Sequence, residues 1–180
     1  MSSEYHTLSF IQLPVHRGTI SAEVVNNGSE VCYRIETFQD AVHLYHKGPL
    51  AGKRPIAVFK NLAGVGAGGI PSVAFRDKEE QPAGFLLTTH SRTRKVLRSG
   101  TAHYEWVLAA NEQRLWYEIK NPLDDDLPFA RLVVGMGAVF LELSTDICLC
   151  SDMCDGVVAA VVLMCLMRDA WLGGASLRLQ

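Results

Sequence analysis

The feature that most constrains this chain is an unbroken apolar run near its end, Val157–Met167, which spans eleven residues. A helix that crosses a bilayer needs about twenty apolar residues, so this run is too short for a membrane anchor. A helix that is apolar around its whole circumference must be buried on all sides. We therefore expect a core helix over about 153–169, wrapped by the rest of the chain.

Polar residues flank this run and predict where the helix begins and ends. Asp152 or Asp155 can cap the amino end, where a carboxylate accepts unpaired backbone N–H groups and meets the positive end of the helix dipole. Arg168 and the glycine pair Gly173–Gly174 supply the complementary stop signal.

The preceding chain has the pattern of an all-β protein, because short segments rich in β-branched and aromatic residues alternate with turn signals. The tight turn Asn26–Gly28 joins two early strands into a hairpin. We predict one domain over 1–180, mainly β, in which about twelve strands form a closed antiparallel barrel around the helix. The alternative is an antiparallel sheet with the helix lying across one face. The predicted strands are Leu8–Leu13, Thr19–Val25, Val31–Thr37, Ala41–His46, Arg54–Lys60, Ser72–Phe75, Phe85–Thr89, Lys95–Arg98, His103–Leu108, Leu115–Ile119, Phe129–Val134 and Val139–Leu143.

Composition excludes several classes of protein. A hydrophobic fraction of 48% with 20% charged residues is that of a globular domain and excludes large-scale disorder. The formal net charge of −2 provides no overall attraction to nucleic acid or an anionic membrane. The first residues lack the basic and apolar regions of a secretory signal, so we expect an intracellular protein, cytoplasmic or peripheral to a membrane. Five cysteines, an odd number, suit reduced thiols better than a disulfide framework.

The order of elements, many strands and then a terminal apolar helix, resembles the tubby C-terminal-like superfamily, which includes LURP-one-related proteins and phospholipid scramblases. The later half of the chain is similar to a fungal family of uncharacterised tubby-like proteins, through Arg92–Arg98, His103–Trp106, Arg114–Tyr117 and Ala130–Val134. The resemblance implies a twelve-stranded barrel threaded by the helix and no settled activity. No local motif aligns with the phosphoinositide-binding residues of tubby proteins or with the calcium-binding segment of scramblases.

The basic segment Arg92–Arg98 is the strongest candidate for ligand binding. Alternation along a strand places Arg92, Arg94 and Arg98 on one face, with Lys95 and Leu97 on the other. Guanidinium groups offer forked donors that fit phosphate. We assign ligand binding to Arg92, Arg94, Lys95 and Arg98. Nucleic acid is disfavoured because no aromatic stacking residues accompany these cations.

Two further groups of residues suggest chemistry. His90, His103 and Glu105 flank the basic segment and form an acid/base grouping, although exposed histidines are the simpler interpretation. Cys148, Cys150 and Cys154 could bind zinc as thiolates, but the spacing lacks a second cysteine or histidine pair, and buried thiols are favoured. No cofactor is expected.

Three other motifs are discounted. The glycine-rich Gly64–Gly69 matches a dinucleotide fingerprint, but the following residues predict turn and strand rather than the required helix. His43 and His46 are spaced so that a strand sends them to opposite faces. The acidic run Asp124–Asp126 lies in a proline-bounded loop and lacks the regular ligand spacing of a calcium site.

Two functions follow from these features. The preferred one is a non-enzymatic module that recognises an anionic lipid headgroup at a membrane surface, or a protein partner, through the basic strand. The alternative is an enzyme or small-molecule carrier with a pocket at a barrel end, using His90, His103, Glu105 or a cysteine thiol.

Overall fold

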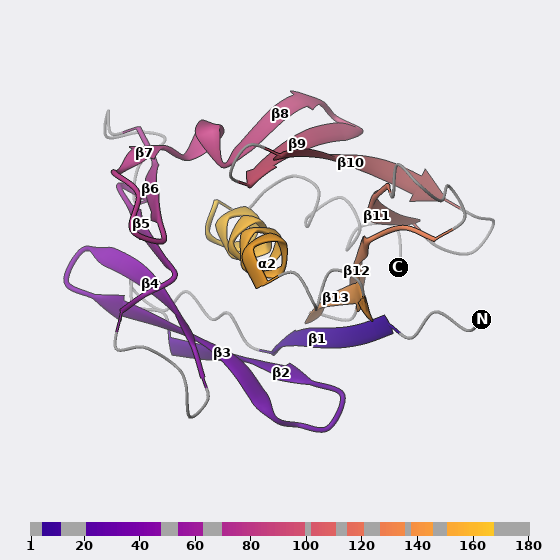
Figure 1. The fold of residues 1–180 in the computed structure, drawn as a ribbon, viewed down its shortest axis with the longest axis horizontal. Helices are drawn as coiled ribbons and strands as arrows, with labels where there is room; N and C mark the ends of the chain where they lie inside the picture. Colours follow the sequence, from indigo (N-terminus) through magenta and orange to yellow (C-terminus); the bar gives the residue numbers. More distant parts are fainter. Residues whose placement is uncertain are drawn as a thin grey trace.

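A computed structural model describes residues 5–11, 21–47, 54–62, 70–99, 102–110, 115–120, 127–135, 138–145 and 151–167. Within these residues the chain forms one antiparallel sheet of thirteen strands and a long helix that follows them (Figure 1). The strands are β1 (Tyr5–Ile11), β2 (Ser21–Asn26), β3 (Val31–Phe38), β4 (Ala41–His46), β5 (Ala57–Lys60), β6 (Ser72–Phe75), β7 (Gln81–Pro82), β8 (Leu87–Ser91), β9 (Arg94–Ser99), β10 (Ala102–Ala110), β11 (Leu115–Ile119), β12 (Ala130–Gly135) and β13 (Ala138–Ser144). The helix is α2 (Ser151–Leu166).

The sheet consists of two meanders, β1 to β7 and β8 to β13, in which consecutive strands pair. The meanders are joined along β1 and β13, which pair from Tyr5 with Ser144 to Phe10 with Val139. The predicted hairpin turn is confirmed, because the Asn26 side-chain oxygen accepts hydrogen bonds from the backbone N–H groups of Gly28 and Glu30. The first strand, β1, and the last, β13, therefore lie side by side at the centre of the sheet.

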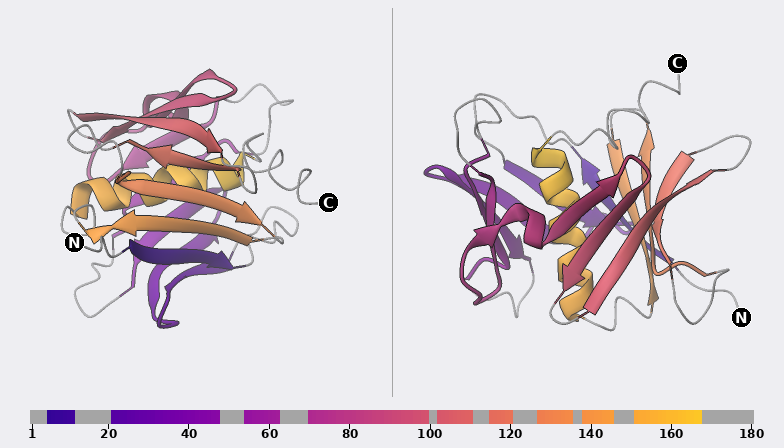
Figure 2. Two further views of the ribbon diagram at one scale, coloured as in Figure 1. Left: turned by 90° about the vertical axis from the view of Figure 1, so that its right-hand side faces the viewer. Right: turned by 90° about the horizontal axis from the view of Figure 1, so that it is seen from above.

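The helix α2 lies inside the curl of this sheet, with strands around several of its sides (Figures 1 and 2). Every residue from Val157 to Met164 is buried, and Val157–Val162 are fully inaccessible to solvent. These side chains share one core with inward residues of the strands, among them Ile35, Leu97 and Leu132. The prediction of a buried apolar helix is confirmed, and it begins two residues earlier than expected.

The closed barrel is not confirmed, because the hydrogen-bonded order of the sheet ends at β7 and β8. Strand β7 has only two residues, and Pro82 lacks a backbone N–H with which to extend the pairing. The chain then crosses between the two edges through a short 3₁₀ helix, η1 (Ala83–Phe85). Single backbone hydrogen bonds tie this link to both sides, from Ala83 N to Pro71 O and from Arg98 N to Leu86 O. The edges of β7 and β8 are thus linked by η1 rather than by strand pairing, and we call this region the seam.

Most strand predictions are confirmed in place, and Ala41–His46, Ser72–Phe75 and Leu115–Ile119 are found with the predicted bounds. Two segments differ: β7 is not among the predicted strands, and Phe85 belongs to η1 rather than to a strand. None of the described helical segments is long and apolar enough to cross a membrane. The predictions for Gly64–Gly69, Asp124–Asp126, Arg168 and Gly173–Gly174 fall outside the described residues.

Candidate functional site

The basic segment lies near one edge of the sheet, where β9 pairs with β8 and β10. Arg94 and Arg98 are on the outer side of β9, as the alternation predicted. Arg92 is exposed in the turn before the strand rather than on the strand itself, because β9 begins at Arg94. Lys95 points inward and is only 2% exposed. The outward set of Arg92, Arg94 and Arg98 is called the basic face below, and Lys95 is not part of it.

The acid/base residues proposed from the sequence lie on the same outer surface. Glu105 of β10 forms an ion pair with Arg94, which offsets one positive charge of the basic face. His103 is exposed and is paired in register with Arg98. His90 is exposed on β8. On the basic face, Arg94 is therefore paired with Glu105, and His103 lies beside Arg98.

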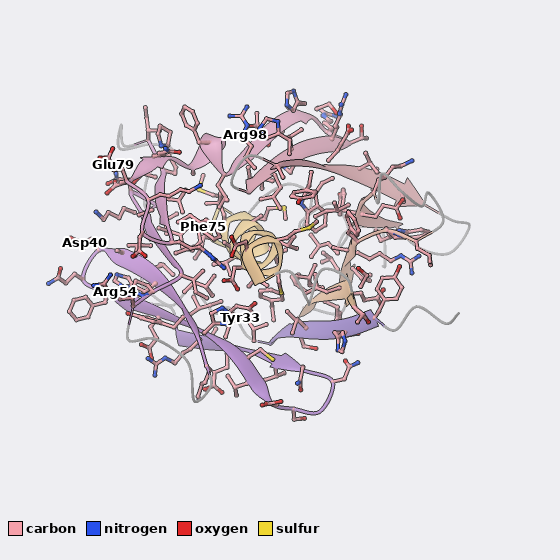
Figure 3. All side chains as sticks on the ribbon, in the orientation of Figure 1. Tyr33, Asp40, Arg54, Phe75, Glu79 and Arg98 are labelled. Carbon is pink, nitrogen blue, oxygen red and sulfur yellow. The ribbon has the colours of Figure 1, made fainter. Side chains whose placement is uncertain are left out.

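An exposed aromatic ring adjoins the basic face. The guanidinium of Arg98 lies 5.9 Å from the centre of the Phe85 ring, and Phe85 is 52% exposed. Figure 3 shows Arg98 on the strands away from the helix. The guanidinium and the ring together form a surface that offers hydrogen-bond donors for a phosphate group and an apolar contact.

A second polar group, which the sequence did not predict, surrounds Asp155 inside the sheet. This carboxylate is 2% exposed and accepts hydrogen bonds at both oxygens. The Tyr33 hydroxyl donates to Oδ1 at 3.1 Å, and Arg76 Nη2 donates to Oδ2 at 2.7 Å. His46 Nε2 lies 2.9 Å from Oδ1. We call Asp155, Tyr33, His46 and Arg76 the Asp155 cluster.

Three separate segments bring the Asp155 cluster together. Tyr33 comes from β3, His46 from the end of β4, and Arg76 from the turn that follows β6. The rings of Tyr33 and His46 stack with centroids 4.9 Å apart, and Figure 3 shows Tyr33 directed toward the helix. Arg76 also forms an ion pair with Asp152 at the start of α2.

The electrostatics of the Asp155 cluster are those of a neutralised buried charge. The hydrogen bond that His46 donates to Asp155 raises the pKa of His46, against the opposing effect of burial. Burial raises the pKa of the Tyr33 hydroxyl well above its usual range. A buried carboxylate is costly unless it is paired and fully hydrogen-bonded, and this one meets both conditions. Of the two residues predicted as caps, Asp152 lies in the first turn of α2, whereas Asp155 lies in the second turn and bonds to side chains of Tyr33, His46 and Arg76 instead of capping the helix.

The predicted cysteine and histidine sites separate in the structure. Cys154 is half-buried, with its sulfur 3.4 Å from the Tyr33 hydroxyl, while Cys148 and Cys150 fall outside the described residues. His46 points inward and His43 contacts Tyr45 on the other face, so their predicted separation is confirmed. No group of three His, Cys, Asp or Glu side chains in the described part of the chain is placed to hold a metal ion.

A pocket of about 270 Å³ lies at the seam, between the link η1, strand β8 and the carboxyl end of α2. Sequence analysis missed it, because it forms where the two edges of the sheet fail to meet. None of His90, His103 and Glu105 lines it.

Comparison of the chain with protein-family models, with curated proteins and with solved structures finds no match. The resemblance to the tubby-like superfamily thus stays a prediction.

Proposed function

We propose that this protein is a non-enzymatic module that binds an anionic lipid headgroup at a membrane surface through the basic face. The observation that carries the proposal is the placement of Arg94 and Arg98 on the outer side of one strand, beside the exposed ring of Phe85. Cations near an anionic membrane each contribute about 1 kcal/mol of attraction, and an adjacent aromatic ring suits the boundary between headgroup and chain.

The proposal includes a tubby-like architecture related to the fungal proteins named above. A β-rich sheet curled around a terminal apolar helix supports it. In the finer form of the proposal, the seam closes into a continuous barrel, with η1 taking the place of strand pairing between β7 and β8. Fold alone does not assign a ligand, so the functional claim depends on the basic face.

Vesicle flotation tests this function. The full chain is mixed with vesicles of neutral phosphatidylcholine, alone or with phosphatidylserine or a phosphoinositide, at low and at physiological salt. We expect binding to the anionic vesicles that weakens with salt, since exposed charges are screened. The variant with Arg92→Ala, Arg94→Ala and Arg98→Ala should lose this binding.

A matched variant shows whether vesicle binding depends on the basic face or only on the net charge of the protein. Arg34, Lys47 and Lys60 are three cations of the other meander, each in an ion pair with a glutamate. Their triple alanine variant removes the same formal charge and should bind vesicles like the wild type. Equal loss in both variants, or unchanged binding in the basic-face variant, would refute the proposal. Absence of binding to every vesicle would turn the search to a protein partner.

The alternative function, an enzyme or small-molecule carrier, gains one observation from the structure. The seam pocket provides a partly open hollow of about 270 Å³, although His90, His103 and Glu105 lie outside it. A carrier role is thus favoured over catalysis by those residues.

A further inference from the structure

The seam pocket has an apolar lining with one side-chain hydroxyl. Its walls include Leu87 from β8, Leu163 and Met164 from α2, and Ile70 before β6. Thr89 of β8 supplies the hydroxyl. Pockets that bind small molecules are typically apolar with a few placed polar groups, which fix the orientation of the ligand.

The hydroxyl of Thr89 is bonded to a buried cation. Lys95 Nζ donates to Thr89 Oγ1 at 2.8 Å, and Lys95 is 2% exposed. Since the oxygen accepts from an ammonium group, the hydrogen of the hydroxyl is available to donate to a ligand. A hydrogen bond from a charged donor polarises the hydroxyl and makes it a stronger donor in turn. Beside its apolar wall, at an exposed residue of β8, the pocket therefore presents a polar point, the Thr89 hydroxyl, that favours a negative acceptor.

We propose that the seam pocket binds a carboxylic acid with a single medium-length alkyl chain. The carboxylate accepts from the Thr89 hydroxyl, which the hydrogen bond from Lys95 polarises, and the chain packs against Leu163 and Met164. A volume of about 270 Å³ holds on the order of nine methylene-sized groups, taking about 30 Å³ for a group the size of a water molecule. This site lies on the inner side of the sheet, so it goes beyond the lipid-headgroup surface proposed above.

Calorimetric titration of the full chain with simple probes tests the ligand class. Decanoate carries the chain and the carboxylate, decan-1-ol carries the chain alone, and acetate carries the carboxylate alone. We expect saturable binding of decanoate at one site, affinity for decan-1-ol that is lower by about tenfold, and no binding of acetate. Equal affinity for decanoate and decan-1-ol, or no binding of either, would overturn the proposal.

Substitutions at the polar point test its role. Thr89→Val keeps the shape and the strand preference of the side chain and removes the hydroxyl, and Lys95→Met removes the cation at similar length. Each should weaken decanoate by about tenfold and decan-1-ol by much less, since a neutral alcohol oxygen accepts a weaker hydrogen bond than a carboxylate does. Unchanged decanoate affinity in Thr89→Val would contradict the assignment.

A second position tests the pocket without touching the buried groups. Gly84 lines the pocket, and a Cβ atom added there would meet no atom within 4 Å. Gly84→Leu should therefore fold normally and block both ten-carbon probes, while Gly84→Ala retains them. If Gly84→Leu binds decanoate like the wild type, the probe binds elsewhere and the proposal fails.

Failure of this proposal and failure of the proposed function are distinguishable. The triple basic-face variant should bind decanoate normally while losing vesicles. Thr89→Val should float with anionic vesicles like the wild type. Loss of decanoate binding in the basic-face variant would place the carboxylate on the outer surface and overturn the pocket assignment.

Discussion

The two ends of α2 are buried in different ways. At the amino end, Asp155 is held by Tyr33 of β3, His46 of β4 and Arg76 of the turn after β6. At the carboxyl end, Leu163 and Met164 face a pocket at the seam. Between the two ends Val157–Val162 are fully buried, and at the carboxyl end Cys165–Met167 are half-buried.

This difference shows how one helix can be both a structural core and part of a binding site. A buried carboxylate requires partners in fixed positions, so the amino end is tied to the sheet by directional bonds. Apolar contacts are not directional, and at the carboxyl end the sheet is open. The region that is free to accept a ligand is therefore the one held only by packing.

The largest loss of stability is expected when a charge is placed in the middle of α2. Val161→Asp places a carboxylate among apolar side chains without the partners that Asp155 has. The cost of burying it should exceed the net stability of about 5–15 kcal/mol that domains possess, so the folded state is lost. Circular dichroism and solubility measure this loss. Val161→Ala, which adds no charge, should remain folded, and a folded, soluble Val161→Asp would contradict the burial described.

A smaller loss of stability is expected when the Asp155 carboxylate is removed from the amino end of α2. Asp155→Ala leaves Arg76 and His46 without their shared carboxylate and the Tyr33 hydroxyl without its acceptor. We expect the free energy of unfolding in urea to fall by about 3 kcal/mol, because removing one member of a buried ion pair is strongly destabilising.

Asp152→Ala is the matched control for this change. Asp152 pairs with the same arginine, but its side chain is 70% exposed. Exposed ion pairs are worth about 0–1 kcal/mol, so this variant should stay close to the wild type. Equal losses in the two variants would show that Asp155 is not the centre of the cluster.

The smallest effect is a pH dependence of stability from His46. Its folded-state pKa is raised above the ordinary value of 6.5 by the hydrogen bond to Asp155. The stabilisation is therefore complete below pH 6.5 and is lost as the pH rises through the folded-state pKa. Because the imidazole is nearly half exposed, screening keeps this contribution below about 1 kcal/mol.

Urea midpoints between pH 5.5 and 8.5 measure this dependence. His46→Gln should flatten the decline of stability with rising pH. His43 provides a contrast, because burial lowers its pKa, and its protonation at low pH opposes folding. His43→Gln should therefore make the decline steeper, and the same change of slope in both variants would contradict the sign assigned to His46.

Local pattern was enough to predict the helix and most of the strands. The run Val157–Met167 could only be buried, and alternation correctly placed Lys95 and Leu97 on the face of the strand opposite Arg94 and Arg98, although Lys95 is too buried for the ligand-binding role assigned to it. Strand β7 was missed because Gln81–Pro82 are two exposed residues whose pairing depends on β6 rather than on their own side chains.

The polar cluster and the pocket could not be predicted in the same way. Asp155 was interpreted as a cap because helix starts favour acids, and its partners lie 79–122 residues away in sequence. One signal was present: Tyr33 alternates with Ile35, and His46 with Leu44, so polar groups stood at inward positions. The seam depends on how the two meanders meet, which is a property of the whole sheet.

We propose that the basic face binds anionic vesicles and that the Asp155 cluster stabilises the fold without taking part in this binding. Flotation with phosphatidylserine vesicles at low salt, run on the triple basic-face variant and on His46→Gln together with their melting temperatures, separates the two roles. We expect the basic-face variant to melt like the wild type and no longer float, whereas His46→Gln floats normally. Wild-type flotation of the basic-face variant, or loss of flotation in folded His46→Gln, would refute this division of roles.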